Sequence, residues 1–397
     1  MLTLRDPVHG FVRADDLEAA LLDSRPLQRL RFVHQLGLAS MVFPGAEHSR
    51  FSHAVGAMEL AGRVYDALAA HQPDLLPPEL GSRERRLVRL AALTHDLGHA
   101  PFSHSAEEHF EDGLDHEAMS RRLLASPELT VCFERHGEGI GPDDVAALLA
   151  GGEGAVGRLL ARVVSGELDV DKMDYLLRDS LFCGVRYGSY DLDRLLDTVR
   201  ALRQDEDDDW GIGVEEGGVH AREALVMARY YMFTQGYFNV TGKVLELHLN
   251  GWLLDEGRRW PSDPQAFLEE DDVAVLARMR ASSSQHAQAV LHRDRFPLAF
   301  ETREHLAPEE RQRFSGLLPE LTARFGAHRL LISNSAKDPH RLAKARVLVE
   351  RYDGTLEPME EASQFMRHLT RIDTFRVYAA REVRDAVAEL LRERWGD

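Results

Sequence analysis

The sequence contains few cysteines, and this excludes two kinds of cysteine-based architecture. Only two of its 397 residues are cysteine, and neither Cys132 nor Cys183 has a second cysteine at CxxC spacing. A disulfide framework and a zinc site built on thiolates are therefore not expected. A metal ion in this protein would have to be bound by histidine and carboxylate side chains.

Long apolar runs and an excess of positive charge are also absent. No uninterrupted apolar stretch approaches the length that spans a membrane, and the first residues form neither a basic nor an apolar leader. The formal net charge is −18, which disfavours a broad surface for nucleic acid or anionic lipid. The sequence predicts a cytoplasmic protein with no membrane partner and no extended nucleic-acid surface. A nucleotide needs only a local basic pocket and remains compatible with this charge.

What the sequence does contain is the composition of an ordinary globular protein, with 44% hydrophobic and 29% charged residues. Helical periodicity and helix-ending glycines predict an all-helical bundle in the first part of the chain. Its predicted helices lie at 18–38, with a break at a proline, and at 51–71, 87–97, 115–125, 142–164, 170–182, 190–203 and 220–255.

The pattern changes after about residue 255, where prolines and serines interrupt the helices. Strands are predicted at 330–332, 345–350 and 374–378, and helices at 358–370 and 381–394. The acidic, glycine-rich stretch 205–218 predicts a solvated loop or a short hairpin. The fold class is therefore mainly α, with a helical core over residues 1–255 and a smaller C-terminal α+β lobe over 256–397.

Histidine and aspartate residues gather near the predicted helix ends. His95 and Asp96 come just before Gly98, and a helix end allows two adjacent side chains to reach one ion. Such a pair alone is weak evidence, because it arises by chance in many chains of this length. His53 and Asp171 add a second imidazole and a second carboxylate from other helices. The four together predict a site for manganese, iron, zinc, nickel or magnesium.

Two further groups of residues surround this set. His99, His104, His116 and Glu117 could transfer protons near neutral pH, since a neighbouring carboxylate raises the basicity of a histidine. Lys172, Tyr175 and Asp179 fall on one face of the predicted helix that also carries Asp171. One helix would thus present both a metal ligand and a row of substrate-binding side chains.

The segments that contain these histidine, aspartate and lysine residues resemble the HD-domain deoxynucleoside triphosphate triphosphohydrolases (dNTPases). The resemblance is strongest to the relatives of the mammalian antiviral dNTPase with a sterile alpha motif. The resemblance continues loosely to about residue 255, and the C-terminal lobe shares only a general character. The bundle is accordingly expected to be an HD domain. The strings that carry the resemblance are 6–10, 28–31, 35–37, 42–46, 50–53, 95–104, 116–117 and 169–175.

The resemblance implies a role for each matched residue. The implied metal ligands are His53, His95, Asp96 and Asp171. His116 matches the active-site histidine, while His99 and His104 match contacts to the α-phosphate and the leaving 5′ oxygen. The residues that match the triphosphate and sugar contacts are Arg50, Lys172, Tyr175, Asp179 and Arg229. Those that match the deoxyribose wall are Gln35, Leu36 and Tyr237.

The resemblance also implies an activity. A metal-activated water would attack the α-phosphorus of a dNTP, and His104 or His116 would protonate the leaving oxygen. Apolar bulk at Leu36 and Tyr237 would disfavour a ribonucleotide without reading the base. The expected cofactor is a divalent transition metal (Mn, Fe, Zn or Ni), with Mg for the triphosphate. The expected partners are dNTP substrates and further copies of the chain, in a homodimer or a homotetramer.

One departure from the family pattern concerns regulation. In activated family members a second, intersubunit nucleotide site is rich in positive charge, which a triphosphate requires. The matching positions here are Leu2, Gln235, Asn239 and Val240. Other residues that match this activator site are retained, and each also suits a role as helix cap or salt-bridge partner: Asp23, Gln28 and Arg31. The sequence leaves open whether a nucleotide activator binds.

Two other functions would use part of the same pattern. A nuclease or phosphodiesterase acting on single-stranded nucleic acid needs the same metal chemistry, but the acidic charge and the row of Lys172, Tyr175 and Arg229 disfavour it. A nucleotide-sensing scaffold without turnover is disfavoured because the metal and proton-transfer residues are intact. Hydrolysis of dNTPs is the function that the sequence favours.

Overall fold

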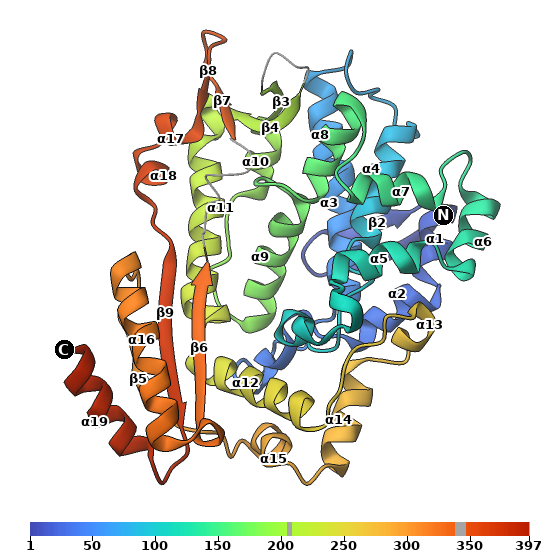
Figure 1. Cartoon of the computed structure of the whole chain (residues 1–397). Helices are drawn as coiled ribbons and strands as arrows, with labels where there is room; N and C mark the ends of the chain where they lie inside the picture. Colours follow the sequence, from blue (N-terminus) through green and yellow to red (C-terminus); the bar gives the residue numbers. More distant parts are fainter. Residues whose placement is uncertain (205–208, 338–346, 397) are drawn as a thin grey trace. The chain divides into compact units, whose positions relative to one another are not determined.

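The computed structural model describes residues 1–204, 209–337 and 347–396, which form many helices and three small sheets (Figure 1). The chain forms two compact units that interleave along the sequence. The first comprises the described parts of 1–232, 259–274 and 340–368, and the second those of 233–258, 275–339 and 369–397. The predicted fold class, mainly α with a smaller α+β region, is confirmed. The predicted domain boundary near residue 255 stays a prediction.

Helix α3 (Arg50–His71) is the central element of the first unit, and most of its residues are buried. It packs against α4 (Arg83–Thr94) and α9 (Val170–Cys183). Gly56 permits the close approach of α9, because a Cβ atom there would lie 2.0 Å from Asp174 Oδ1. Local sequence sets the limits of α9: Asp169 caps its first turn, and Gly184 ends it with a φ of 71°.

The remaining elements of the first unit surround these three helices. They are β1 (Leu2–Asp6), β2 (Gly10–Ala14), α1 (Asp16–Leu22), α2 (Arg25–Arg29), η1 (Leu30–Phe32), η2 (Gly37–Met41), η3 (Ser103–His109), η4 (Glu111–Gly113), α5 (His116–Leu124), α6 (Pro127–His136), α7 (Pro142–Leu149), α8 (Gly154–Val164), α10 (Leu192–Thr198), β3 (Val199–Arg203), β4 (Trp210–Glu215), η5 (Glu216–Gly218), α11 (Val219–Tyr231), α13 (Pro264–Phe267), β7 (Leu348–Glu350), β8 (Leu356–Pro358), α17 (Met359–Ala362) and α18 (Gln364–His368). No helix among the described residues is both long and apolar enough to cross a membrane.

Three predicted helices are interrupted in the structure. The helix predicted over 190–203 ends at Thr198, and β3 follows because the backbone of Val199–Arg203 pairs antiparallel with β4. Residues 205–208 of the predicted loop or hairpin lie outside the described residues. The helix predicted over 142–164 divides where Gly151 and Gly152 adopt positive φ. The helix predicted over 220–255 divides at the π-helical turn Met232–Tyr237, before α12.

The second unit is built on an antiparallel sheet in the order β5-β9-β6. Helices α16 and α19 cover one face, where Phe314, Phe375 and Leu391 belong to one apolar core. Helix α12 packs on the other face, and Tyr378 Oη donates to Val240 O at 2.9 Å. The elements of this unit are α12 (Val240–Asp255), α15 (Gln285–His292), β5 (Leu298–Glu301), α16 (Pro308–Phe325), η7 (Ala327–Arg329), β6 (Leu330–Lys337), β9 (Ile372–Ala379) and α19 (Arg384–Trp395), while α14 (Asp272–Ala281) spans both units.

The predictions for the C-terminal part are mostly confirmed. The strands predicted at 330–332 and 374–378 lie in β6 and β9, and the helix predicted at 381–394 is α19. The strand predicted at 345–350 begins at Leu348, and residues 345–346 lie outside the described residues. The helix predicted at 358–370 is divided at Ser363 into α17 and α18.

The buried His248 faces the partly buried His286 in the second unit. His248 Nδ1 lies 2.9 Å from His286 Nδ1, and Phe296 N donates to His248 Nε2 at 3.2 Å. Burial, together with the nearby His286, lowers the pKa of His248 to about 4. The folded protein therefore holds His248 neutral, whereas the unfolded chain takes up a proton below its ordinary pKa of about 6.5.

We expect His248 to reduce the free energy of unfolding by about 2 kcal/mol between pH 7.5 and pH 5. Urea denaturation followed by circular dichroism at several pH values measures this loss. The variant His248→Gln retains an acceptor for Phe296 N but does not titrate, so its stability should fall less over the same range. Equal pH dependence of the free energy of unfolding in the two proteins would contradict the role of His248.

Candidate active site

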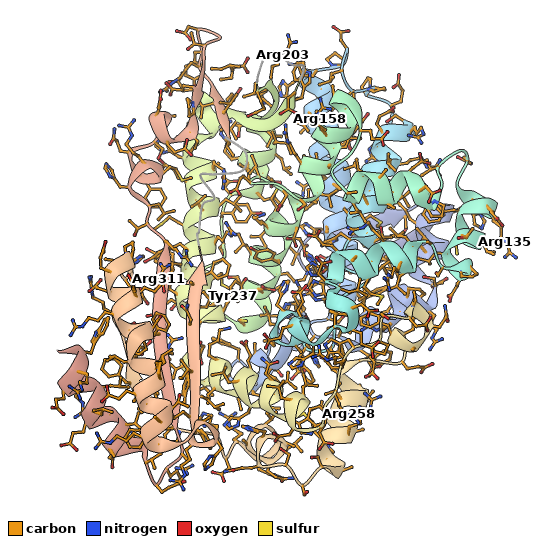
Figure 2. The ribbon with its side chains drawn as sticks, viewed as in Figure 1. Arg135, Arg158, Arg203, Tyr237, Arg258 and Arg311 are labelled. Atoms are coloured by element: carbon orange, nitrogen blue, oxygen red, sulfur yellow. The ribbon has the colours of Figure 1, made fainter. Side chains whose placement is uncertain are left out.

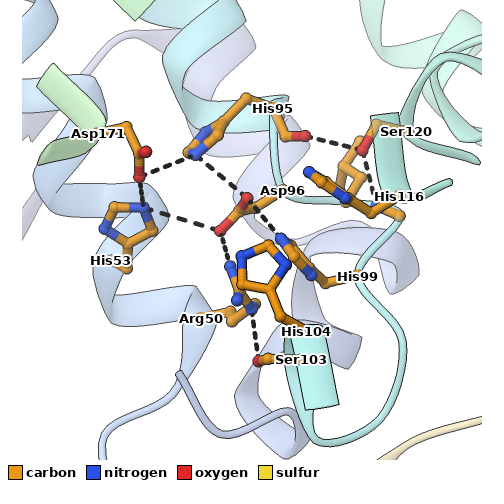
Figure 3. Close-up of polar contacts among 12 residues, drawn as sticks. Arg50, His53, His95, Asp96, His99, Ser103, His104, His116, Ser120 and Asp171 are labelled. Atoms are coloured by element: carbon orange, nitrogen blue, oxygen red, sulfur yellow. Dashed lines mark hydrogen bonds and ion pairs between the residues drawn. The ribbon is translucent and has the colours of Figure 1, made fainter. Parts of the chain in front are cut away.

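The four predicted metal ligands lie together at one end of three helices (Figure 3). His53 is in the first turn of α3, His95 caps α4 and is followed by Asp96, and Asp171 is in the first turn of α9. His53 Nε2 is 3.1 Å from Asp171 Oδ1 and 3.7 Å from Asp96 Oδ2. His95 Nε2 is 3.2 Å from Asp96 Oδ1. Two imidazole nitrogens and two carboxylates therefore converge on one small region.

The hydrogen bonds behind the two imidazoles suit metal binding. His53 Nδ1 donates to Asp174 Oδ2 at 2.7 Å, and His95 Nδ1 donates to Ala92 O at 2.7 Å. This tautomer leaves a lone pair on each Nε2. Both Nε2 atoms are buried, and neither has a well-aligned hydrogen-bond partner among the described residues. The residues present therefore fit a divalent metal, because two oriented imidazole lone pairs and two carboxylates are the ligands that such an ion requires.

The charges around His53 favour a cation at this point. Burial lowers the pKa of His53, but the hydrogen bonds to Asp171 and Asp174 and the charges of Asp174 and Asp96 outweigh it and raise the pKa to about 10. Burial raises the pKa of Asp171, and the contacts with His53 and His95 outweigh this and hold it below its ordinary value. A metal ion and a proton would therefore compete for the same nitrogen.

Asp174 organises the site from behind His53. Its carboxylate accepts from His53 Nδ1, from His9 Nε2 at 2.6 Å and from two nitrogens of Arg178 at 2.8 Å each. Arg178 also donates to Asp6 Oδ2 at 2.8 Å. Burial raises the pKa of Asp174, but Arg178 outweighs it, and the carboxylate stays ionised. Its only signal in the sequence is the i, i+4 spacing to Arg178, and no role was predicted for either residue.

The three predicted histidines form a cluster beside Asp96. The rings of His99 and His116 are stacked with centroids 4.2 Å apart, and His104 meets His99 edge-on at 4.7 Å. His99 Nε2 lies 3.2 Å from Asp96 Oδ1, which joins the cluster to the predicted metal ligands. Each ring brings a nitrogen within 4.8 Å of the other two. The arrangement can bind an anionic oxygen or transfer a proton at a phosphate beside the metal.

Glu107 is the carboxylate that holds this cluster. It accepts from His104 Nδ1 at 3.0 Å and forms an ion pair with His116 Nδ1. Burial lowers the pKa of His116, but the hydrogen bond and charge of Glu107 outweigh it and raise the pKa above its ordinary value. Glu117 was predicted to be the carboxylate beside these histidines, but it is exposed, and none of the described contacts joins it to these rings. Glu107 was missed because it precedes His116 by nine residues.

The backbone before His104 is strained. Phe102 and Ser103 both have a φ of 59°, and a left-handed conformation costs roughly 1–2 kcal/mol for a residue other than glycine. Arg50 Nε donates to Ser103 Oγ at 2.8 Å, and Arg50 Nη1 forms an ion pair with Asp96. The predicted phosphate ligand Arg50 therefore links this turn to a predicted metal ligand.

The predicted substrate residues of α9 lie near the four metal-ligand residues. Lys172 Nζ donates to Asp169 Oδ2 at 2.5 Å and to Gly166 O at 2.7 Å. Burial raises the pKa of Tyr175, whose hydroxyl is hydrogen-bonded to Arg229 of α11. Asp179 is buried and accepts from His48 Nε2 at 2.8 Å. The structure thus brings Tyr175 and Arg229 together, as their shared predicted role requires.

The three residues predicted to surround the deoxyribose do not all lie in the same unit. Gln35 is buried, its N–H donates to His48 O at 3.0 Å, and its Oε1 accepts no hydrogen bond. Leu36 is the next residue and precedes η2. Both lie in the first unit, as Asp179 does. Tyr237 belongs to the second unit (Figure 2), so its place at the sugar stays a prediction.

The residues predicted for an activator site have local structural contacts. Asp23 caps the C-terminal end of α1. Gln28 Nε2 donates to Leu22 O at 2.7 Å, and its Oε1 accepts from Arg31 Nε at 2.9 Å. The Arg31 guanidinium also lies 3.7 Å from the centroid of the Phe51 ring. Nucleotide binding at these residues stays a prediction.

Comparison with known protein families identifies the domain architecture. Residues 50–151 match the HD domain, and residues 190–395 match the HD associated region. The chain belongs to the family of HD-domain proteins that carry this associated region. The HD match contains His53, His95 and Asp96, whereas Asp171 lies between the two matched segments.

Relatives of known sequence agree with this assignment. The uncharacterized protein YwfO of Bacillus subtilis is 38% identical over 66% of this chain and 59% of its own length. The deoxynucleoside triphosphate triphosphohydrolase SAMHD1 homolog of Dictyostelium discoideum is 33% identical over 70% of this chain and 55% of its own length. The chain therefore spans a little more than half of these relatives. The resemblance to HD-domain dNTPases is confirmed at the level of the family.

Solved structures show the same fold over nearly the whole chain. A hypothetical protein from Aquifex aeolicus superposes with a TM-score of 0.83 at 29% identity, covering 98% of this chain and 99% of its own. A phosphohydrolase from Bacteroides thetaiotaomicron has a TM-score of 0.76 at 23% identity, covering 96% of this chain and 100% of its own. The chain therefore shares its fold with both of these proteins over nearly its whole length.

The contacts of Asp174 generate a prediction about metal binding. We expect Asp174→Asn to weaken metal affinity about 10- to 100-fold, because an amide cannot accept from His53, His9 and Arg178 together. Metal content after dialysis against graded chelator, measured by elemental analysis, tests this. Asp66→Asn is a matched control on α3, since Asp66 pairs only with Arg85 among the described ion pairs. Equal metal content in the two variants would contradict the role of Asp174.

Proposed function

We propose that this protein is a metal-dependent dNTP triphosphohydrolase that cleaves a dNTP into deoxynucleoside and triphosphate. The observation that carries the proposal is the contact between two groups: the metal-ligand set His53, His95, Asp96 and Asp171, and the histidine cluster that His99 joins to Asp96 at 3.2 Å. A site with these two parts can activate water and protonate a leaving group at one phosphate. The relatives named as dNTP triphosphohydrolases support the choice of substrate.

The four ligand residues would hold a divalent transition metal such as manganese, iron, zinc or nickel. When bound, such an ion supplies an activated water and polarises a phosphate oxygen. Arg50, Lys172 and Arg229 would bind the triphosphate, and Tyr175 would contribute its hydroxyl beside Arg229. A magnesium ion on the triphosphate belongs to the same proposal. The three cationic side chains would neutralise the charge that develops as the bond to the α-phosphorus breaks.

The histidine cluster would move the proton. As water oxygen bonds to the α-phosphorus, the bond to the 5′ oxygen breaks, and that oxygen needs a proton. His116 can hold one near neutral pH because Glu107 raises its pKa, and His104 is held by the same carboxylate. Burial, together with the charge of Arg50, lowers the pKa of His99 well below its ordinary value. His99 would therefore stay neutral and contact the α-phosphate.

The remaining features of the proposal concern selectivity and assembly. Gln35, Leu36 and Asp179 would contact the deoxyribose, so dNTPs with several bases would be accepted while ribonucleotides are disfavoured. A cytoplasmic homodimer or homotetramer is proposed, with Asp23, Gln28 and Arg31 as the candidate activator residues.

The first test is direct measurement of products. Purified protein with manganese is expected to release triphosphate and deoxynucleoside from a panel of dNTPs, detected by chromatography and by phosphate release coupled to a triphosphatase. The panel is run with and without added dGTP, alongside a measurement of particle mass. If no dNTP yields product at several pH values, while single-stranded DNA is cut, the protein is a nuclease and the proposal is wrong.

Substitutions at two neighbouring residues of α9 distinguish metal binding from substrate binding. We expect Asp171→Ala to lose metal and activity, because it removes a proposed ligand. Lys172→Ala should retain metal and raise KM about 10-fold or more, since a charge-assisted contact to phosphate is lost. Elemental analysis and steady-state kinetics distinguish the two. Equal loss of metal in both variants would refute these roles.

A further inference from the structure

A segment of the HD associated region holds the loop that carries His99 and His104 of the histidine cluster. We call residues 97–113 the histidine loop; residues 259–274 belong to the same compact unit. Trp260 Nε1 donates to Ala106 O at 2.6 Å, and Trp260 N donates to His109 O at 2.8 Å. Glu111 N in turn donates to Trp260 O at 3.0 Å. This segment therefore fixes the second half of the histidine loop by three hydrogen bonds from one residue.

Asp272 binds the first half of the same loop. Its side chain is buried, and Oδ1 accepts from Phe102 N at 2.7 Å. The other oxygen, Oδ2, accepts from His34 N at 2.9 Å and from His34 Nδ1 at 2.6 Å. One buried carboxylate thus joins the loop to the segment that precedes η2.

These contacts act on the strained part of the loop. Phe102 and Ser103 have positive φ, and neither is a glycine, so the surrounding contacts have to hold this backbone. Asp272 binds Phe102 directly, and it fixes His34, whose carbonyl accepts from Ser103 Oγ at 2.7 Å. Both strained residues are therefore held through the same carboxylate.

The direction of His104 depends on this turn. His104 follows Ser103 directly, and its side chain is 67% exposed, so packing does little to orient it. The ring contacts Glu107, His99 and His116, and the backbone conformation at this turn sets the direction in which the side chain leaves the chain. Ser103 also accepts from Arg50 Nε, so a shift of the turn would move a proposed phosphate ligand as well.

We propose that Asp272 is a positioning residue for His104 and Arg50, through which the HD associated region sets the geometry of the phosphate-binding side of the site. It acts through the backbone of the Phe102–Ser103 turn and does not contact substrate or metal. The catalytic consequence rests on the proposed function, whereas the structural role does not.

The test compares Asp272→Asn with Asp271→Asn. An asparagine has one side-chain oxygen, so it cannot accept from both Phe102 N and the two groups of His34. Asp271 is the matched control: it caps the same helix by accepting from Ala274 N at 2.7 Å, and none of the described contacts joins it to the histidine loop. The two substitutions remove the same charge from adjacent residues.

Hydrogen exchange provides a readout that is independent of activity. We expect Asp272→Asn to increase exchange in peptides covering 98–106, while peptides from α3 and α9 and the bound metal content remain as in the wild type. Steady-state kinetics with a dNTP should then show kcat reduced about 10- to 100-fold, with a smaller change in KM. Asp271→Asn should match the wild type in both measurements.

The outcomes separate this inference from the proposed function. An inactive wild type together with loosening specific to Asp272→Asn overturns the proposed function and supports the positioning role. If Asp272→Asn behaves like Asp271→Asn in exchange and kcat, the inference is wrong. If Asp272→Asn fails to fold, Trp260→Phe tests whether the associated region positions the loop. It removes the hydrogen bond to Ala106 O and reduces a buried side chain, and unchanged exchange over 103–110 with unchanged kcat would overturn the inference.

Discussion

Asp174 accepts hydrogen bonds from three segments of the chain that are otherwise separate: the turn after β1, the first turn of α3 and the middle of α9. A carboxylate without access to water is stable only when its acceptor positions are filled and its charge is compensated, and Arg178 supplies most of that compensation. Removing one partner of such a pair typically costs about 3–5 kcal/mol. The direction of His53, and with it the position of a bound metal, depends on this interaction.

The same principle recurs at the histidine cluster. Asp174 holds His53 at Nδ1, and Glu107 holds His104 and His116 at their Nδ1 atoms. In each case a carboxylate behind the ring decides which nitrogen faces the site. The chemistry differs because the facing nitrogen can bind a metal in one case and carry a proton in the other. A carboxylate–histidine contact thus orients both the proposed metal ligand and the proposed proton donors.

The sequence was sufficient for the helices and residues whose signals are local. The 3.6-residue periodicity located α3 and α9, and histidines beside a helix-ending glycine indicated a metal site. The strand β3 was missed because Val199–Arg203 becomes a strand only by pairing with β4. Asp174 and Asp272 were missed for a related reason: Asp174 accepts from His53, which is 121 residues away in sequence, and Asp272 accepts from Phe102, which is 170 residues away. A single sequence contains no local signal for such contacts.

The interleaving of the compact units has a consequence for the synthesis of the protein. Trp260 and Asp272, which contact the histidine loop within the first unit, come late in the sequence, after the chain has passed through α12 of the second unit. Domains usually begin to fold as they leave the ribosome, N-terminal parts first. Here the metal-ligand residues up to Asp171 emerge well before the residues that hold the strained turn. The nascent chain therefore contains all four proposed metal ligands before it contains the residues that hold the histidine loop, and the site is complete only when the associated region has been made.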